Sequence, residues 1–410
     1  MRPFPQPGKS HSDESIASSA TCNVAIFWVA AFLICVFVLE DGAPARAQSP
    51  RAMADRYVML VNTAMAPQMD APKFLQFDRS PYDGLAVSFS DAYDTSPVPT
   101  FVAMRAQAAS WKKSTAKEIW PWVYLNRMIG ANAGEGNQLT QVPYFQNFQG
   151  LDLNGKAGAR NDFLENWRNA LLLAKSAGVP GIVCDLEFYN NYKAYDLGEL
   201  ARMVSMPRHD VLIALAQLGA QMADIAEKDY PGATLWFLFT GFTRPDYRVI
   251  DGRPYYLAAT YIVEGLLEEI RQNHFPLRVL AGGEVGLGYC HASVDDLHQA
   301  IDKRAAVFAP LLEKYNGILE LAGTLTLWSE RSAKKNWVAQ GTCGTSQAAT
   351  VEDLIPYMEL LFRSYRYDWI YASPNGGYFA FQRSSATRFD AAIGKAKALA
   401  PELIDPPPAH

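Results

Sequence analysis

Residues Gly181 to Tyr189 read Gly-Ile-Val-Cys-Asp-Leu-Glu-Phe-Tyr, an apolar run that ends in acidic and aromatic residues. We interpret this stretch as a strand, in which side chains alternate, so Asp185 and Glu187 would point to the same side. Two neighbouring carboxylates cost free energy through repulsion and partial desolvation. We therefore expect them to have a function. The alternative is a strand end whose acids cap the next helix or pair with an arginine.

Seven further apolar segments with strand character flank this one, and helical patterns separate them. We predict strands at 56–63, 85–90, 119–127, from 182 onward, and at 233–239, 277–281, 318–327 and 368–372. The predicted helices span 71–77, 101–113, 161–177, 211–228, 255–273, 294–315, 351–364 and 389–399. Pro121 suggests that the third strand begins just after it. The long polar segment 130–159 is typical of a functional loop.

Strict alternation of strands and helices predicts a parallel sheet, either open and doubly wound or closed into a barrel. An open nucleotide-binding sheet requires a glycine-rich fingerprint after its first strand. Thr63-Ala64-Met65-Ala66 stands there instead. The count of eight units therefore favours an α/β fold of the (β/α)8 TIM-barrel type, formed as a single domain by residues 48–400.

The amino terminus predicts a targeting segment, residues 1–47. Residues 23–39 are uncharged and apolar, and Ala45-Arg46-Ala47 matches a small-residue cleavage pattern, so a secretory signal peptide is expected. An uncleaved membrane anchor is the alternative, because the run is nearly long enough to span a bilayer. Either way we expect the barrel in the periplasm or outside the cell. Residues 401–410 form a proline-rich tail.

The charge and the cysteine content of the chain indicate which partners and bonds to expect. The formal net charge is -5, with no long basic run, so nucleic acid is not an expected partner, and we expect a monomer. Contact with a membrane would involve only residues 23–39, if they remain uncleaved. Cys290 and Cys343 lie in loop-like sequence and should pair in an oxidising compartment. Cys184 should be a core residue.

The carboxyl ends of barrel strands gather at one mouth, so catalytic residues are expected at the predicted strand ends. No pair of the six histidines has metal-ligand spacing, and no Gly-x-Ser-x-Gly elbow occurs. Neither a zinc site nor a serine esterase is therefore expected, and we predict no cofactor. Several acids together with Trp and Tyr are what glycoside hydrolysis requires.

The chain resembles bacterial exported, glycosidase-like (β/α)8 proteins over most of residues 55–380. The landmarks are loose motifs, namely 56–63, Pro81-Tyr82-Asp83-Gly84-Leu85, 181–189, Gly265-Leu266-Leu267 before Gly282-Gly283-Glu284, and Asp368-Trp369-Ile370-Tyr371. The resemblance implies a barrel and an acid after the eighth strand in many members. Ser373-Pro374 stands at that position here, which puts a role for this strand end in doubt.

We assign Glu187 as general acid/base, because many retaining glycosidases of this fold carry that residue at the end of strand four. Asp185 and Phe188 would raise its pKa. Glu284 is the first candidate for the second carboxylate, unless it only caps a turn, and Glu330 is its rival, unless it pairs with Arg331. Further substrate-binding candidates are Asn126 and Arg127 as polar contacts and Tyr189, Tyr289, Trp328 and Tyr371 as stacking platforms.

Two other functions fit the same residues. A non-catalytic glycan-binding barrel, used in polysaccharide export or surface assembly, would keep the aromatic mouth without an acid pair. A metal-dependent lyase or hydrolase would hold magnesium or calcium through Asp185, Glu187 and Glu284, since such ions prefer oxygen ligands.

Overall fold

The structure is a computed structural model in which the barrel unit, residues 49–410, is compact. It describes residues 56–65, 71–89, 100–113, 115–124, 128–129, 142–143, 159–186, 196–203, 205–240, 249–250, 253–254, 258–284, 286–288, 291–327, 350–372 and 383–403. The predicted targeting segment 1–47 and the tail 404–410 lie outside these ranges. Among the described residues, no helix is long and apolar enough to cross a membrane.

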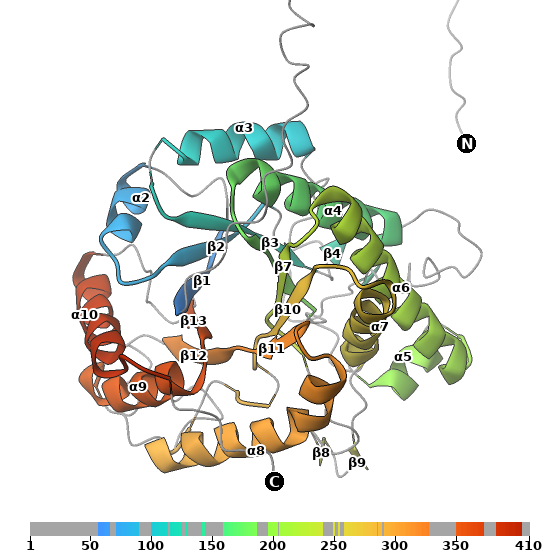
Figure 1. Ribbon diagram of the computed structural model, residues 1–410. Helices are drawn as coiled ribbons and strands as arrows, with labels where there is room; N and C mark the ends of the chain where they lie inside the picture. The colour runs from blue at the N-terminus through green and yellow to red at the C-terminus, as the bar shows by residue number, and fades with distance from the viewer. Residues whose placement is uncertain are drawn as a thin grey trace, which may run out of the picture. The chain divides into compact units, whose positions relative to one another are not determined.

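Parallel strands form a ring at the centre of the barrel unit (Figure 1). The strands are β1 (Tyr57–Met65), β2 (Gly84–Ser88), β3 (Glu118–Tyr124), β6 (Gly181–Asp185), β7 (Thr234–Phe237), β10 (Arg278–Ala281), β11 (Leu319–Leu321), β12 (Gly323–Leu327) and β13 (Tyr367–Ala372). Their order around the ring is β11-β10-β7-β6-β3-β2-β1-β13-β12. Every pairing among them is parallel.

The ring closes through one strand that changes partner at Ala322. β11 pairs with β10 and β12 pairs with β13, and only Ala322 separates β11 from β12. The Ala322 N–H donates to the Ala281 carbonyl at 2.8 Å. The segment 318–327, predicted as one strand, is therefore the seventh position of a (β/α)8 barrel, broken by a single residue.

Helices surround the ring (Figure 1). They are α2 (Ala71–Asp78), α3 (Phe101–Trp111), α4 (Ala159–Ala177), α5 (Leu197–Met203), α6 (Arg208–Asp229), α7 (Ala258–Asn273), α8 (Val294–Lys314), α9 (Ile355–Ser364) and α10 (Arg383–Leu399). The 3-10 turn Glu352–Leu354 precedes α9. The sequence did not predict α5, nor the small antiparallel pairs β4 (Met128–Ile129) with β5 (Val142–Pro143) and β8 (Val249–Ile250) with β9 (Arg253–Pro254).

The predicted eight-unit barrel is confirmed, with one error in the third strand. Pro121 lies inside β3 and pairs in register with Val87. β3 pairs with β6 only from Trp122 onward, so Pro121 precedes the first residue pair between these two strands. The missing proline N–H is tolerated there for this reason.

The helix before β6 ends as its sequence predicts. Gly178 has φ +70°, and the Val179 N–H donates to the Ala174 carbonyl at 3.0 Å. A left-handed residue just after the last helical turn is the usual position of glycine. The chain then reverses and enters β6 at Gly181, which delivers Asp185 to the carboxyl end of the ring.

Register separates the inner face of the barrel from its outer face, because residues paired across parallel strands share a face. Trp122 pairs with Val183 and Tyr124 with Asp185. Trp120, on the same face of β3, packs edge-on against Trp236 at 6.0 Å, from a strand that is not its neighbour. Asp185 therefore faces the interior. The intervening residues of β1 and β2 pack outward against the helices: Val58, Leu60, Leu85 and Val87.

Candidate active site at the carboxyl ends of the strands

Asp185 is the last residue of β6 and is only 2% exposed. Its register partner on β3 is Tyr124, which is also buried. Leu186 follows and is buried as well. The predicted acid at the end of strand four therefore lies at the mouth of the barrel, shielded from bulk water. Glu187 and Tyr189 lie outside the described residues.

Glu284 lies three residues beyond the end of β10 and is partly exposed. Its N–H approaches the Leu238 carbonyl at 3.4 Å, and the Leu238 N–H donates to the Cys184 carbonyl at 2.9 Å. This strip of backbone hydrogen bonds links the end of β10 to the end of β6 through the end of β7. Asp185 and Glu284 consequently come from strand ends that are two positions apart in the ring.

Hydrogen bonds at Gly282 fix the backbone that leads to Glu284. The Gly282 carbonyl accepts a hydrogen bond from the Trp369 indole at 2.5 Å, and the Gly282 N–H donates to the Phe237 carbonyl at 2.6 Å. Gly283 has φ +87°, a conformation that favours glycine. These contacts fix the turn from which Glu284 projects.

Arg304 of α8 secures the same region from outside the ring. It is 2% exposed, and its two terminal nitrogens donate to the carbonyls of Ala281 and Ala322, each at 2.8 Å. Its guanidinium also lies over the rings of Phe308 and Tyr365 at 5.4 and 5.3 Å. One cation thus joins the end of β10 to the break between β11 and β12.

Aromatic residues line the inner face below the mouth. Trp122 and Tyr124 lie 4.7 Å apart between ring centroids, and Trp369 and Tyr371 lie 6.4 Å apart. Tyr371, predicted as a platform, is on the inner face of β13 and partly exposed. The sequence interpretation missed Trp122, Tyr124 and Trp369. Their alternation in the β3 and β13 segments was the available signal, because inward positions recur every second residue.

The remaining predicted residues lie outside the described part of the chain. They are Asn126, Arg127, Tyr289, Trp328 and Glu330, and the predicted disulfide partners Cys290 and Cys343. Cys184 is described and is fully buried without a disulfide, as predicted for a core residue. Burial, with the Asp185 charge nearby, raises the pKa of its thiol well above its usual value, which makes it a poor nucleophile.

Some buried polar atoms near the carboxyl ends have no hydrogen-bond partner. They include Trp122 Nε1, Thr240 Oγ1 and His291 Nε2. His291 is 5% exposed, and its Nδ1 lies 3.6 Å from Asp296. Burial lowers the pKa of His291, which favours the neutral imidazole. Within the described residues, no group of three His, Cys, Asp or Glu side chains could hold a metal ion.

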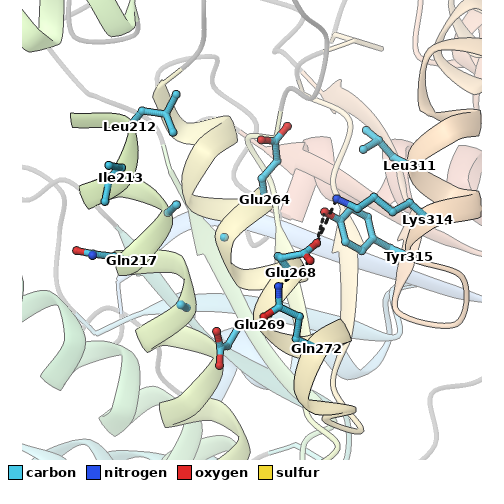
Figure 2. A pocket seen from close by; sticks show the side chains of 13 residues that line it. Leu212, Ile213, Gln217, Glu264, Glu268, Glu269, Gln272, Leu311, Lys314 and Tyr315 are labelled. Atoms are coloured by element: carbon cyan, nitrogen blue, oxygen red, sulfur yellow. Dashed lines mark hydrogen bonds and ion pairs between the residues drawn. The ribbon is translucent and has the colours of Figure 1, made fainter. Parts of the chain in front are cut away.

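A groove of about 600 Å³ lies on the outer helical layer (Figure 2). None of the mouth residues described above lines it. It lies between α6, α7 and the end of α8, and Glu268 accepts hydrogen bonds there from Gln272 at 2.8 Å and Tyr315 at 3.4 Å. Lys314 pairs with the same carboxylate at 3.1 Å. Hydrogen bonds from Arg271, Gln272 and Lys314 lower the pKa of Glu268 to about 2. A carboxylate with so many donors serves as an ion-pair centre, which is a structural role.

No protein-family model matches the chain, and no curated protein matches it. Solved structures similar to the chain include the catalytic domain of a beta-amylase from Paenibacillus polymyxa, at 10% identity and a TM-score of 0.45, covering 84% of this chain and 100% of that one. A family 5 xyloglucanase from Paenibacillus pabuli has 10% identity and a TM-score of 0.44, with coverages of 83% and 98%. A sugar phosphate isomerase/epimerase from Parabacteroides distasonis has 10% identity and a TM-score of 0.36, with coverages of 87% and 98%.

These likenesses are too distant to carry an argument about activity. The (β/α)8 assignment rests on the strand order, the parallel register and the closure at Ala322. This fold hosts many unrelated chemistries. Any function must therefore be argued from the residues of the mouth.

Proposed function

We propose that the protein hydrolyses O-glycosyl bonds of a poly- or oligosaccharide at the mouth of the barrel. The observation that supports this proposal is the placement of Asp185 and Glu284 on strand ends two positions apart. Strands lie about 4.8 Å apart, so the two backbones are about 10 Å apart. Glu187 follows Asp185 by two residues, and a Glu187–Glu284 carboxyl separation of roughly 5 to 10 Å, as used in glycoside hydrolysis, would be compatible with these strand positions.

In this proposal Glu187 is the general acid/base, and Asp185 adjusts its pKa. Glu284 is the second carboxylate, with Glu330 as its rival. A buried carboxylate two residues away in the sequence would raise the pKa of Glu187, which a general acid at neutral pH requires. The partly exposed Tyr371 would stack on a sugar ring. Aromatic faces provide apolar area suited to the flat side of a pyranose.

The test is a screen of the purified protein against bacterial and plant polysaccharides, with release of reducing ends as the readout. Glu187→Gln and Glu284→Gln should each lower turnover at least about a hundredfold, in line with the typical contribution of acid/base catalysis. Glu402→Gln, which changes an exposed acid far along the chain, is the matched control. Full activity of Glu187→Gln on a substrate that the wild type cleaves would disprove the assignment.

Binding without turnover is the outcome that would favour a glycan-binding barrel. A glycan array with the wild type would then give signals, while no polysaccharide would be cleaved. Loss of activity on chelation, with recovery on adding magnesium or calcium, would favour the metal-dependent alternative.

We further propose that the protein is exported to the periplasm or the cell surface. The support is the apolar run 23–39 followed by the Ala45-Arg46-Ala47 pattern. Fractionation of cells that produce the chain with a carboxyl-terminal tag tests this proposal. An amino terminus at Gln48 would establish cleavage, membrane retention would establish an anchor, and a cytoplasmic pool of full length would contradict export.

A further inference from the structure

The turn that carries Glu284 is closed by its own hydrogen bonds. The Gly283 carbonyl accepts from the backbone N–H groups of Leu287 and Gly288 at 3.0 and 3.1 Å. Leu287 is 5% exposed and packs in the hydrophobic cluster between the strands and the outer helices. Glu284 therefore belongs to a compact turn that is anchored on the helical layer.

Gly283 leaves no room for a side chain on the outer side of this turn. A Cβ atom there would lie 2.9 Å from the Ala322 carbonyl oxygen and 3.0 Å from a terminal nitrogen of Arg304. Arg304 cannot give way easily, because it donates to the carbonyls of Ala281 and Ala322. The residue directly before Glu284 is thus packed against a guanidinium that is itself held in place.

Trp369 fixes the same turn from the inner face of the barrel. Its indole donates to the Gly282 carbonyl at 2.5 Å, reaching from β13 to the end of β10 across the strand formed by β11 and β12. Its ring packs edge-on against Tyr371, with 6.4 Å between ring centroids. Trp369 is only 1% exposed, so it acts on the site through the backbone. One side chain thus links the turn of Glu284 to the proposed sugar platform.

We propose that Trp369 is a positioning residue, which sets the place of the Glu284 carboxylate relative to a sugar ring stacked on Tyr371. This inference rests on the proposed function, and it adds the group that orients the second carboxylate toward the bound sugar. A catalytic group must be held within about 0.5 Å of its productive place, and a misplacement of about 1 Å can lower the rate a hundredfold. Arg304 supports the turn on its outer side, and the indole of Trp369 supports it on the inner side.

The substitution Trp369→Phe tests the proposal, because it keeps an aromatic ring beside Tyr371 and removes the N–H that Gly282 accepts. The values of kcat and KM are measured on the best polysaccharide from the screen, well below the Tm of every variant. We expect kcat to fall at least about tenfold while KM changes by less than about twofold. The matched control is Trp120→Phe, which removes a hydrogen bond to Tyr57 elsewhere in the same interior. It should lower the Tm and leave kcat unchanged.

A double-mutant cycle separates positioning from a general loss of structure. If Trp369 acts through Glu284, Trp369→Phe should lower the residual activity of Glu284→Gln by less than about twofold, because the carboxylate that it positions is already gone. The same loss of kcat in both backgrounds would show that Trp369 only supports the fold, and it would overturn the inference.

The outcomes distinguish this inference from the function on which it rests. If the wild type cleaves its substrate and Trp369→Phe has an unchanged kcat, the role of Trp369 is wrong while the proposed function stands. If Glu284→Gln keeps full activity, Glu284 is not the second carboxylate, and the inference fails while hydrolysis through Glu187 and Glu330 stands.

If the wild type cleaves no polysaccharide, the proposed function fails and the inference fails with it. Should Trp369→Phe not fold, benzothienylalanine incorporated at position 369 replaces it, since this residue keeps the shape of tryptophan and has sulfur in place of the N–H. The same loss of kcat is expected from it, and an unchanged kcat would overturn the inference.

Discussion

At the amino-terminal end of the barrel Tyr57 donates to Glu118 at 2.7 Å and accepts from the Trp120 indole at 2.8 Å, whereas toward the carboxyl end the Trp122 indole has no partner. Trp120 and Trp122 are two residues apart on one strand and face the same interior. Their difference shows that the hydrogen bonding of interior polar groups is not the same at the two ends of the barrel axis.

The second polar group of the amino-terminal end is equally complete. Arg278 donates to Glu320 at 2.9 Å and to the Tyr367 hydroxyl at 3.1 Å. These residues begin or lie near the start of β10, β11 and β13. In barrels of this kind the amino-terminal face contributes stability and the carboxyl-terminal face carries function. The comparison predicts different costs for matched substitutions at the two ends.

The largest effect is expected for Arg304→Met. The change leaves the carbonyls of Ala281 and Ala322 without their charged donor, and hydrogen bonds to charged groups contribute about 1.5–3 kcal/mol each. We expect a loss of about 3–5 kcal/mol in the free energy of unfolding, measured by urea denaturation. The neighbouring Lys303→Met, at an exposed position of the same helix, should change it by less than about 0.5 kcal/mol. Equal effects would mean that the backbone below the mouth is not held by Arg304.

Next comes Tyr57→Phe, which removes a hydroxyl with two partners at the amino-terminal end. Burying the Trp120 donor with a weaker partner should cost about 1–3 kcal/mol. Tyr365→Phe is the matched control, since the Tyr365 hydroxyl is buried without a partner. That control should be neutral or slightly stabilising in the same denaturation experiment. A large loss in the free energy of unfolding for Tyr365→Phe would contradict the expected difference between paired and unpaired hydroxyls.

A smaller effect is expected from pH, through Asp390 of α10. Burial raises the pKa of Asp390 to about 7 against an ordinary value of 3.8, and Lys117 partly opposes this rise. The folded state therefore keeps a proton that the unfolded chain releases, so stability falls as the pH rises from about 4 to 7. Because the carboxyl is partly exposed, we expect a fall of about 1–2 kcal/mol.

The control for that pH dependence is Asp390→Asn, which should flatten the slope between pH 4 and 7. Some slope should remain, because burial also raises the pKa of Asp368, whose carboxyl oxygens have no hydrogen-bond partner. Unfolding midpoints of both proteins measured across this range provide the test. An unchanged slope in the variant would exclude Asp390 as a source.

The smallest effect is expected in the outer groove, from Glu268→Gln. The lowered pKa of Glu268 means that its ion pairs stabilise the fold above about pH 4.5 and are lost as the pH falls toward 2. The side chain is 31% exposed, and such pairs contribute below about 1 kcal/mol. The cost of the substitution at neutral pH should shrink further in high salt. A cost of several kcal/mol would show that this groove matters as much as the barrel ends.

The sequence predicted all eight strand positions, because buried parallel strands are short apolar runs between turn residues. The start of the third strand was harder. Pro121 is tolerated inside β3 only because β6 begins to pair with β3 one residue later. The residues around Pro121 carry no information about the register of that neighbouring strand. The break at Ala322 depends in the same way on which strands flank it.

For the site, the sequence alone determined that Asp185 ends a buried strand and that Glu284 follows another, since both properties are local. Only the tertiary structure decided that these two strands are separated by one strand, that Trp369 holds the turn before Glu284, and that Trp120 is paired while Trp122 is not. The physical reason is that pairing and proximity depend on residues distant in the chain, which only barrel closure brings together.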